Sequence, residues 1–148
     1  ANSTRHPMRV HVKMAGKKDG TITAIYMEVR ANTGPYGNHC LTVPMNSCSK
    51  TLPLFKVDNM KYDLEVYYTN TPPAGAYQGY GTPKGTYGLM MVMAQLAEKL
   101  GIDYKTMVEK NHVSEGYMLE ILKGLGEGRE GNVVPVVVWI RQSKKVVR

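Results

Sequence analysis

Apolar and basic residues alternate along the first part of the chain. From Met8 to Ala15 every second residue is apolar, and Arg9, His11 and Lys13 lie between them. A period of two is typical of a half-exposed β-strand. The pair Asp19-Gly20 supplies a turn signal, and the β-branched run that follows, residues 21–30, is again extended. The pattern predicts an antiparallel hairpin.

The segment from Ala31 to Lys61 has no lasting period. Glycine, proline and asparagine recur in it too closely for a long helix or strand. We therefore expect a long irregular loop, which in a compact domain is usually functional or covered by another element. Alternation returns over Tyr62–Tyr68 and predicts a strand that leads directly into the glycine-rich stretch Thr69–Gly85.

Helical periodicity follows this stretch. Apolar residues at three- and four-residue spacing predict a helix over Thr86–Leu100, ended by Gly101. Asp103 is a suitable N-cap for a second helix that extends to Asn111. The methionines of both helices are expected to fill the core.

The C-terminal part combines a turn-like segment, Gly124–Gly131, with the apolar run Val133–Ile140, which only Pro135 interrupts. A strand this apolar needs partners on both faces. We expect residues 133–148 to be an altered or truncated end of the domain. Apolar surface left exposed there would favour self-association.

Composition narrows the function classes. The 148 residues, 43% of them hydrophobic, suit a single domain with a real core. We expect a cytoplasmic chain that does not enter a membrane, because there is neither a signal pattern nor an apolar run of spanning length. The net charge of +7 is scattered rather than clustered, which favours solvated surface over nucleic-acid binding.

Two cysteines, Cys40 and Cys48, lie in the irregular segment, with His39 beside the first. Reduced thiols are the simpler interpretation. A zinc site that used all three side chains would lack the regular ligand spacing of known zinc motifs.

The order strand, glycine-rich loop, helix allows an anion to bind at the helix N-terminus, where backbone amides are unpaired. The spacing of Gly79, Gly81 and Gly85 matches neither the dinucleotide fingerprint nor the P-loop, so a tight structural turn is an equal alternative. Tyr77 and Tyr80 either stack on a planar ligand or pack against the protein.

The segment Ala76–Lys84, AYQGYGTPK, resembles the Ala-Phe/Tyr-Arg-Gly-Phe/Tyr-Gly-x-Pro-Gln segment of the molybdenum-binding subunits of the xanthine dehydrogenase and aldehyde oxidase family. Between about Thr4 and Gly116, further segments are similar to this family in the same order: Arg5–Pro7, Lys18–Ala24, Ala31–Gly37, Thr69–Asn70 and Leu96–Asp103.

This resemblance implies an α+β fold, a two-layer mixed sheet with helices packed on one face, in which residues 1–148 form a single partial molybdopterin-binding domain. It also implies cofactor-binding roles for Ala76, Tyr77, Gln78, Gly79 and Gly81, and a substrate-stacking role for Tyr80. Gln78 stands where the family usually has an arginine whose backbone amide approaches the metal. Glycines at 79 and 81 would let the backbone come close to the cofactor.

The resemblance further implies a molybdopterin cofactor with molybdenum, either plain or as the cytosine dinucleotide. The expected partners are other segments of the molybdenum subunit, an iron–sulfur subunit and an FAD subunit. The substrate would be an aldehyde or an N-heteroaromatic compound such as xanthine, another purine or nicotinate. Oxygen inserted into its C–H bond would come from water.

The chain departs from the family at Gln78, at Lys84, where glutamine is usual, and in a segment 31–61 that contains no arginine to orient the substrate. The general-base glutamate of the family lies in a downstream motif that is not recognisable here. We therefore expect the chain alone to be inactive. The alternatives are a non-catalytic binding or assembly module that retains the fold, and a nucleotide-binding protein that uses the loop from Gly79 to Gly85.

Overall fold

The structure is a computed structural model that describes residues 3–113 and 137–142. Its elements follow one another along the chain as β1 (Thr4–Arg5), β2 (Met8–Gly16), β3 (Ile22–Gly34), α1 (Thr42–Ser49), the 3₁₀ helix η1 (Leu52–Leu54), β4 (Asn59–Tyr68), β5 (Ala74–Gly75), α2 (Thr82–Leu100), α3 (Tyr104–Asn111) and β6 (Val137–Gln142).

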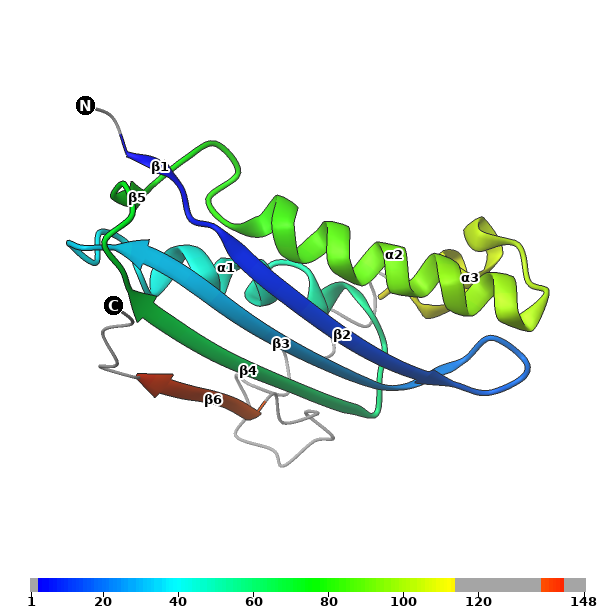
Figure 1. The fold of residues 1–148 in the computed structure, drawn as a ribbon. Helices are drawn as coiled ribbons and strands as arrows, with labels where there is room; N and C mark the ends of the chain where they lie inside the picture. The colour runs from blue at the N-terminus through cyan, green and yellow to red at the C-terminus, as the bar shows by residue number, and fades with distance from the viewer. Residues whose placement is uncertain (1–2, 114–136, 143–148) are drawn as a thin grey trace, which may run out of the picture.

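Four strands form a mixed sheet in the order β2-β3-β4-β6, and helices α1 and α2 cover one of its faces (Figure 1). Strands β2 and β3 are antiparallel, whereas β4 is parallel to β3 and β6 is parallel to β4. A separate two-stranded parallel pair joins β1 to β5. This arrangement confirms the predicted α+β class with a mixed sheet and helices on one face.

The side chains of β3 and β4 alternate between the core and the open face of the sheet. Met27 and Val29 of β3 and Leu64 of β4 are buried under the helices, where they meet Leu89 and Met93 of α2. Glu28 and Arg30 of β3 and Glu65 of β4 lie on the open face, where they form ion pairs. The period of two in the sequence therefore arises because one face of the sheet packs on the core and the other does not.

The predicted hairpin is confirmed. Strand β2 pairs with β3 from Met8 opposite Ala31 onward, and the turn closes with Gly20 N donating to the Lys17 oxygen at 3.0 Å. Gly20 has a φ of 85°, a left-handed conformation that glycine adopts without a steric penalty.

The expectation of an irregular loop over residues 31–61 is wrong. Strand β3 continues to Gly34, β4 begins at Asn59, and α1 and η1 lie between them. Pro44 lies in the first turn of α1, where its missing N–H breaks no helical hydrogen bond. Pro44 is therefore compatible with the start of a helix, although proline interrupts a helix further along.

Both predicted helices are confirmed. Helix α2 begins at Thr82, four residues before the predicted start at Thr86, and Gly101 ends it with a φ of 68°. Asp103 caps α3 by accepting a hydrogen bond from Thr106 N at 3.1 Å. None of the helices in the described part of the chain has the length and apolar character that a membrane crossing requires.

The predicted C-terminal strand, 133–140, falls only partly within the described residues, where β6 pairs with β4 from Val137 opposite Lys61 to Gln142 opposite Val66. The predicted turn at 124–131 lies outside the described residues. The altered end at residues 133–148 and the self-association that it would cause stay predictions.

Candidate functional site

The glycine-rich loop leaves the end of β4 and returns to the helix layer at α2. On the way, Ala74 and Gly75 form β5 and pair with Thr4 and Arg5 of β1. Thr4 N donates to the Pro73 oxygen at 3.0 Å. Two segments far apart in the sequence thus hold the start of the loop in place, and residues 76–79 emerge from this anchor into solvent.

Arg5 fixes the exposed part of the loop. Its Nη1 donates to the Gln78 backbone oxygen at 2.8 Å, and its guanidinium carbon lies 4.2 Å from the centroid of the Tyr77 ring. One side chain therefore holds a carbonyl and an aromatic ring together. The guanidinium fork suits this double contact better than a lysine would.

The amides of Gln78 and Gly79 remain available. Neither forms a hydrogen bond within the described residues, whereas Tyr80 N donates to the Tyr77 oxygen at 2.8 Å and Thr82 N to the Gly79 oxygen at 3.0 Å. With Arg5 holding the Gln78 carbonyl, these two donors lie on a fixed stretch of exposed backbone. Such an arrangement fits a ligand that presents hydrogen-bond acceptors, as an oxygen-rich cofactor does.

The backbone turns sharply over three consecutive left-handed residues, with φ of 81° at Gly79, 43° at Tyr80 and 95° at Gly81. For tyrosine this conformation costs about 1–2 kcal/mol. Contacts elsewhere must therefore hold Tyr80. A residue kept in a costly conformation marks a position where function commonly depends on backbone geometry.

Two side chains hold the Tyr80 ring. Its hydroxyl lies 2.6 Å from His39 Nδ1 and 2.9 Å from Thr42 Oγ1, and the two rings meet edge to face with centroids 5.6 Å apart. Thr42 begins α1, so the helix that sequence reasoning missed supplies part of this support. The sequence contains no local signal for these contacts, because they join residues 38 and 41 positions apart.

Close packing of the protein itself also explains two glycines of the loop. A Cβ atom at Gly81 would lie 1.9 Å from the Val43 oxygen, and one at Gly85 would lie 1.7 Å from the Ser47 oxygen. Both distances are far below any real contact, so these glycines allow α2 to approach the backbone of α1. Glycine at 81 is therefore required by helix packing, and its predicted role towards a cofactor stays a prediction.

A basic group lies next to β1. His6 is fully buried, yet neither ring nitrogen has a hydrogen-bond partner within the described residues. Burial and the nearby Lys84 cation lower the pKa of His6. Lys84 Nζ donates to the His6 backbone oxygen, and burial together with the charge of Arg5 lowers the pKa of Lys84 to about 8. This corner therefore favours a neighbour that is negative or electron-rich.

The side chains considered for a zinc site are Cys40, Cys48 and His39. Over residues 3–113 and 137–142, no three histidine, cysteine, aspartate or glutamate side chains gather as a metal site would require. Cys40 and Cys48 are free thiols, and burial raises the pKa of Cys48 to about 12. His39 contacts Tyr80.

Of the predicted site residues, the structure brings Tyr77 and Gln78 together at Arg5 and leaves Ala76, Tyr77, Gln78 and Gly79 exposed. Tyr80 is half-buried against His39 and Thr42. The sequence identifies Arg5 only within a matching segment and His39 only as a possible zinc ligand, and it gives no sign of Thr42 or of the support that these three side chains provide.

The chain is similar in sequence and in fold to proteins of known families. Residues 1–112 match the family model of the molybdopterin cofactor-binding domain. The chain is 51% identical over 135 residues to the probable hypoxanthine oxidase XdhD of Escherichia coli (strain K12), covering 91% of this chain and 14% of that protein. It is 33% identical over 102 residues to the nicotinate dehydrogenase large molybdopterin subunit of Eubacterium barkeri, covering 69% of this chain and 24% of that subunit. The solved aldehyde oxidoreductase from Desulfovibrio gigas superposes with a TM-score of 0.70 at 28% identity, covering 77% of this chain and 13% of that one.

Proposed function

Because this chain belongs to the molybdopterin cofactor-binding domain family, we propose that it supplies a cofactor- and substrate-facing loop to a molybdenum hydroxylase. The chain spans only 14% of the length of the E. coli relative. We propose that it acts as one piece of a larger molybdenum subunit and that its activity needs the other segments of that subunit. The cytoplasmic location stays a prediction.

One observation carries this proposal. Arg5, His39 and Thr42 hold the loop from both ends, while the amides of Gln78 and Gly79 belong to exposed residues and have no partner among residues 3–113 and 137–142. A loop that was only a connection would not need three anchoring side chains from distant segments. Fixed, unpaired donors on exposed backbone instead suit a bound cofactor, because no reorganisation is needed when the ligand arrives.

In this proposal the amides of Gln78 and Gly79 donate hydrogen bonds to the cofactor, and Ala76 and Tyr77 border it. The departure from arginine at position 78 is tolerated, because the contact uses the backbone. Molybdopterin with molybdenum would supply the redox chemistry. Electrons would leave through iron–sulfur and FAD subunits, so that substrate and water give the hydroxylated product, two protons and two electrons.

Tyr80 is the proposed substrate-stacking residue. Its ring is held by its hydroxyl, so the aromatic face has a fixed orientation. A planar N-heteroaromatic substrate would use that face better than a small aldehyde, because stacking energy grows with the overlap of the rings. The names of two relatives, a probable hypoxanthine oxidase and a nicotinate dehydrogenase, support the same substrate class.

The first test measures molybdenum by elemental analysis and pterin by fluorescence on the complex that purifies with the chain from its own cells. We expect both in stoichiometric amounts. Gln78→Pro, which removes the amide, should lower the content of both, whereas Gln78→Ala, which keeps the amide, should not. Equal loading of the two variants would overturn the assigned contact. Absence of both components from the wild-type complex would favour the non-catalytic assembly module.

A second pair of variants tests Tyr80. Tyr80→Ala should raise KM for a purine or nicotinate about five- to 140-fold, since stacking of a base on an aromatic ring contributes about 1–3 kcal/mol. Tyr80→Phe keeps the stacking surface and the edge-to-face contact with His39 but loses the hydroxyl contacts that orient the ring, so its KM should rise clearly less than that of Tyr80→Ala. If both variants behave alike, the ring does not stack on the substrate.

A further inference from the structure

Strand β2 is an edge of the main sheet. It is nine residues long, and only β3 pairs with it within the described residues. Asn32 N donates to the Pro7 oxygen, which sets the antiparallel register so that odd-numbered residues of β2 bond to β3. The N–H and C=O groups of Val10, Val12 and Met14 therefore point away from the sheet. No described residue occupies them.

The open face of β2 carries a row of cations. Arg9 lies directly opposite Arg30, whose guanidinium is already engaged by Glu28 at 2.7 Å and Glu65 at 3.3 Å. Like charges opposite each other on neighbouring strands are unfavourable. Arg9 is exposed and has no acidic partner among the described residues, so its guanidinium is available to a carboxylate of a partner.

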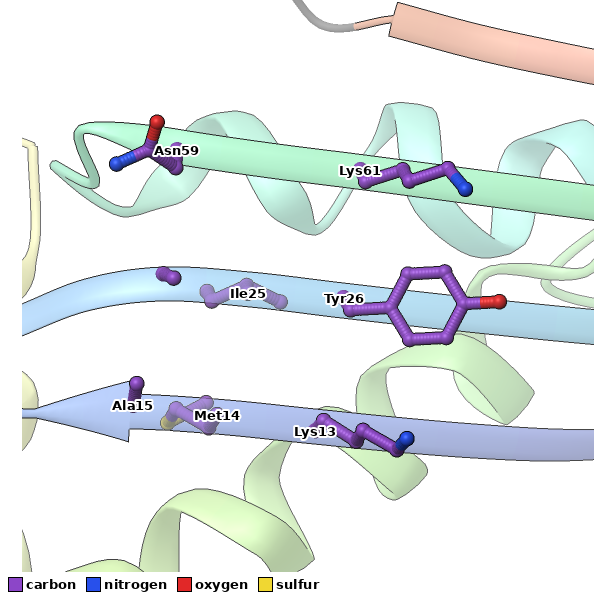
Figure 2. A pocket seen from close by; sticks show the side chains of 8 residues that line it. Lys13, Met14, Ala15, Ile25, Tyr26, Asn59 and Lys61 are labelled. Atoms are coloured by element: carbon purple, nitrogen blue, oxygen red, sulfur yellow. The ribbon is translucent and has the colours of Figure 1, made fainter.

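Lys13, four residues further along β2, is likewise an exposed cation without an acidic partner among the described residues. Its Nζ lies 6.0 Å from the centroid of the Tyr26 ring and has no ion pair with any described residue. Lys61, which approaches the same ring from β4 at 5.3 Å, already has Asp63 at 3.0 Å. Figure 2 shows the Tyr26 ring between these two lysines on three neighbouring strands.

Each of the two unpaired cations borders a hollow on the open face. Lys13 lines one of about 390 Å³ together with Tyr26 and Lys61 (Figure 2). Arg9 lines another of about 500 Å³ together with Arg30 and Tyr67. Both hollows reach β2, so side chains of a strand placed beside β2 would have room to enter them.

The other side of the β2 edge is apolar. Val10, Val12 and Met14 are only partly buried, although they pack on the core. Helix α2, which lies over β2 (Figure 1), also exposes 69% of Tyr87 and 44% of Met91, one turn apart. A strand added at this edge would therefore meet cations on one face and apolar side chains on the other.

We propose that β2 binds an extended segment of a protein partner, which adds to the sheet as a further strand. The segment carries acidic residues at alternate positions and apolar residues between them. Arg9 and Lys13 are four residues apart, which on a strand is about 13 Å, so acidic residues at positions i and i+4 of the partner would reach both. Main-chain hydrogen bonds supply affinity and the charges supply selectivity, as in other strand additions.

A second copy of the chain does not fit this edge. Pairing β2 with another β2 would place its two cations, Arg9 and Lys13, on the same face as those of the second copy, which is unfavourable. Basic residues on an exposed edge commonly prevent such self-pairing. The surface also does not depend on the molybdopterin site, since β2 contributes none of the residues proposed to contact the cofactor.

The test uses the full chain and a synthetic peptide of the length of β2 that alternates glutamate and valine. We expect this peptide to bind and the matching lysine–valine peptide not to bind. Binding should slow hydrogen exchange at the outward amides of Val10, Val12 and Met14. The double variant Arg9→Glu/Lys13→Glu should weaken binding at least about tenfold.

The matched control changes the same charge in the hairpin turn, as Lys17→Glu/Lys18→Glu, and should weaken binding far less. Equal weakening by both double variants would mean general charge attraction and would overturn the proposal. Binding without protection of the outward amides, or equal binding of the two peptides, would do the same. Protection of these amides in the chain alone, together with a dimer in sedimentation, would assign the edge to self-pairing instead.

Discussion

The contact between α1 and α2 is the part of the fold on which the candidate site most depends. A Cβ at Gly85 would lie 1.7 Å from the Ser47 oxygen, in the backbone of α1. Real Cβ atoms do not come within 3.0 Å of such an atom, so Gly85→Ala requires the two helices to separate by at least 1.3 Å, the difference between these distances. We expect this substitution to destabilise the protein strongly.

The size of the effect follows from two opposing contributions. Alanine in place of glycine inside a helix stabilises it by about 1 kcal/mol. Overpacking costs about 1–3 kcal/mol and more where the obstacle cannot rotate away, as a backbone carbonyl cannot. A gap of more than 1 Å would also remove up to half of the dispersion energy between the facing atoms. With overpacking at its upper end, about 3 kcal/mol, and about 1 kcal/mol regained from helix propensity, the net loss for Gly85→Ala is about 2 kcal/mol or more.

Gly88→Ala is the matched control in the same helix. A Cβ there would lie 3.0 Å from a methyl group of Val10, a side-chain atom that can shift slightly. The gain in helix propensity is the same, so this variant should be as stable as the wild type within about 1 kcal/mol.

Urea unfolding followed by circular dichroism compares the two variants. With an m-value of about 2 kcal/mol/M, a difference of about 3 kcal/mol lowers the midpoint of Gly85→Ala by about 1.5 M relative to Gly88→Ala. Equal midpoints, or a lower midpoint for Gly88→Ala, would refute the close approach of α1 to α2 and with it the support that α1 gives to Tyr80.

Substitutions at three further positions test the hairpin and α3. The Asp19 carboxylate accepts hydrogen bonds from the backbone N–H of Thr21 and from Lys110, which lower its pKa from 3.8 to about 2. Its contribution to stability should therefore be present above pH 4 and lost as the pH falls towards 2. Asp19→Asn should flatten this part of the curve of unfolding free energy against pH. Asn111→Ala leaves two buried backbone groups of the hairpin without their side-chain partner, each now bonded at 2.8 Å, and should cost about 2–4 kcal/mol in denaturant unfolding. Asp103→Ala removes the cap on Thr106 and should cost about 1 kcal/mol, whereas Asp103→Ser should retain most of the stability in the same assay.

Elements with a regular local pattern were predictable from the sequence. Strand β2, the hairpin and helix α2 each bury one face against the same core, so the spacing of apolar residues reports the burial directly. Helix α1 was not predictable in this way. It contains Pro44, Asn46 and few apolar residues, and its helical form is stabilised by the contact with α2 that Gly81 and Gly85 permit. Such an element depends on tertiary packing, which a single sequence does not display.

The candidate site likewise combines features that the sequence predicts with contacts that only the folded chain shows. The loop at 76–81 was found through its resemblance to a family, and the structure adds what holds it. Arg5 reaches Gln78 across 73 positions, and His39 reaches Tyr80 across 41. Neither contact has a sequence spacing that a pattern could report, because both depend on the pairing of β1 with β5 and on the position of α1.

The glycines of the loop illustrate how a strong sequence signal can have more than one cause. Gly81 and Gly85 are required by the approach of α2 to α1, and Gly79 by its left-handed backbone. A high glycine content is thus explained without a ligand. What packing does not explain is the non-glycine residue within this turn, Tyr80, which pays a conformational cost and needs His39 and Thr42 to hold it. The restrained Tyr80 and the unpaired amides of Gln78 and Gly79 therefore support a cofactor- and substrate-facing loop more strongly than the glycines do.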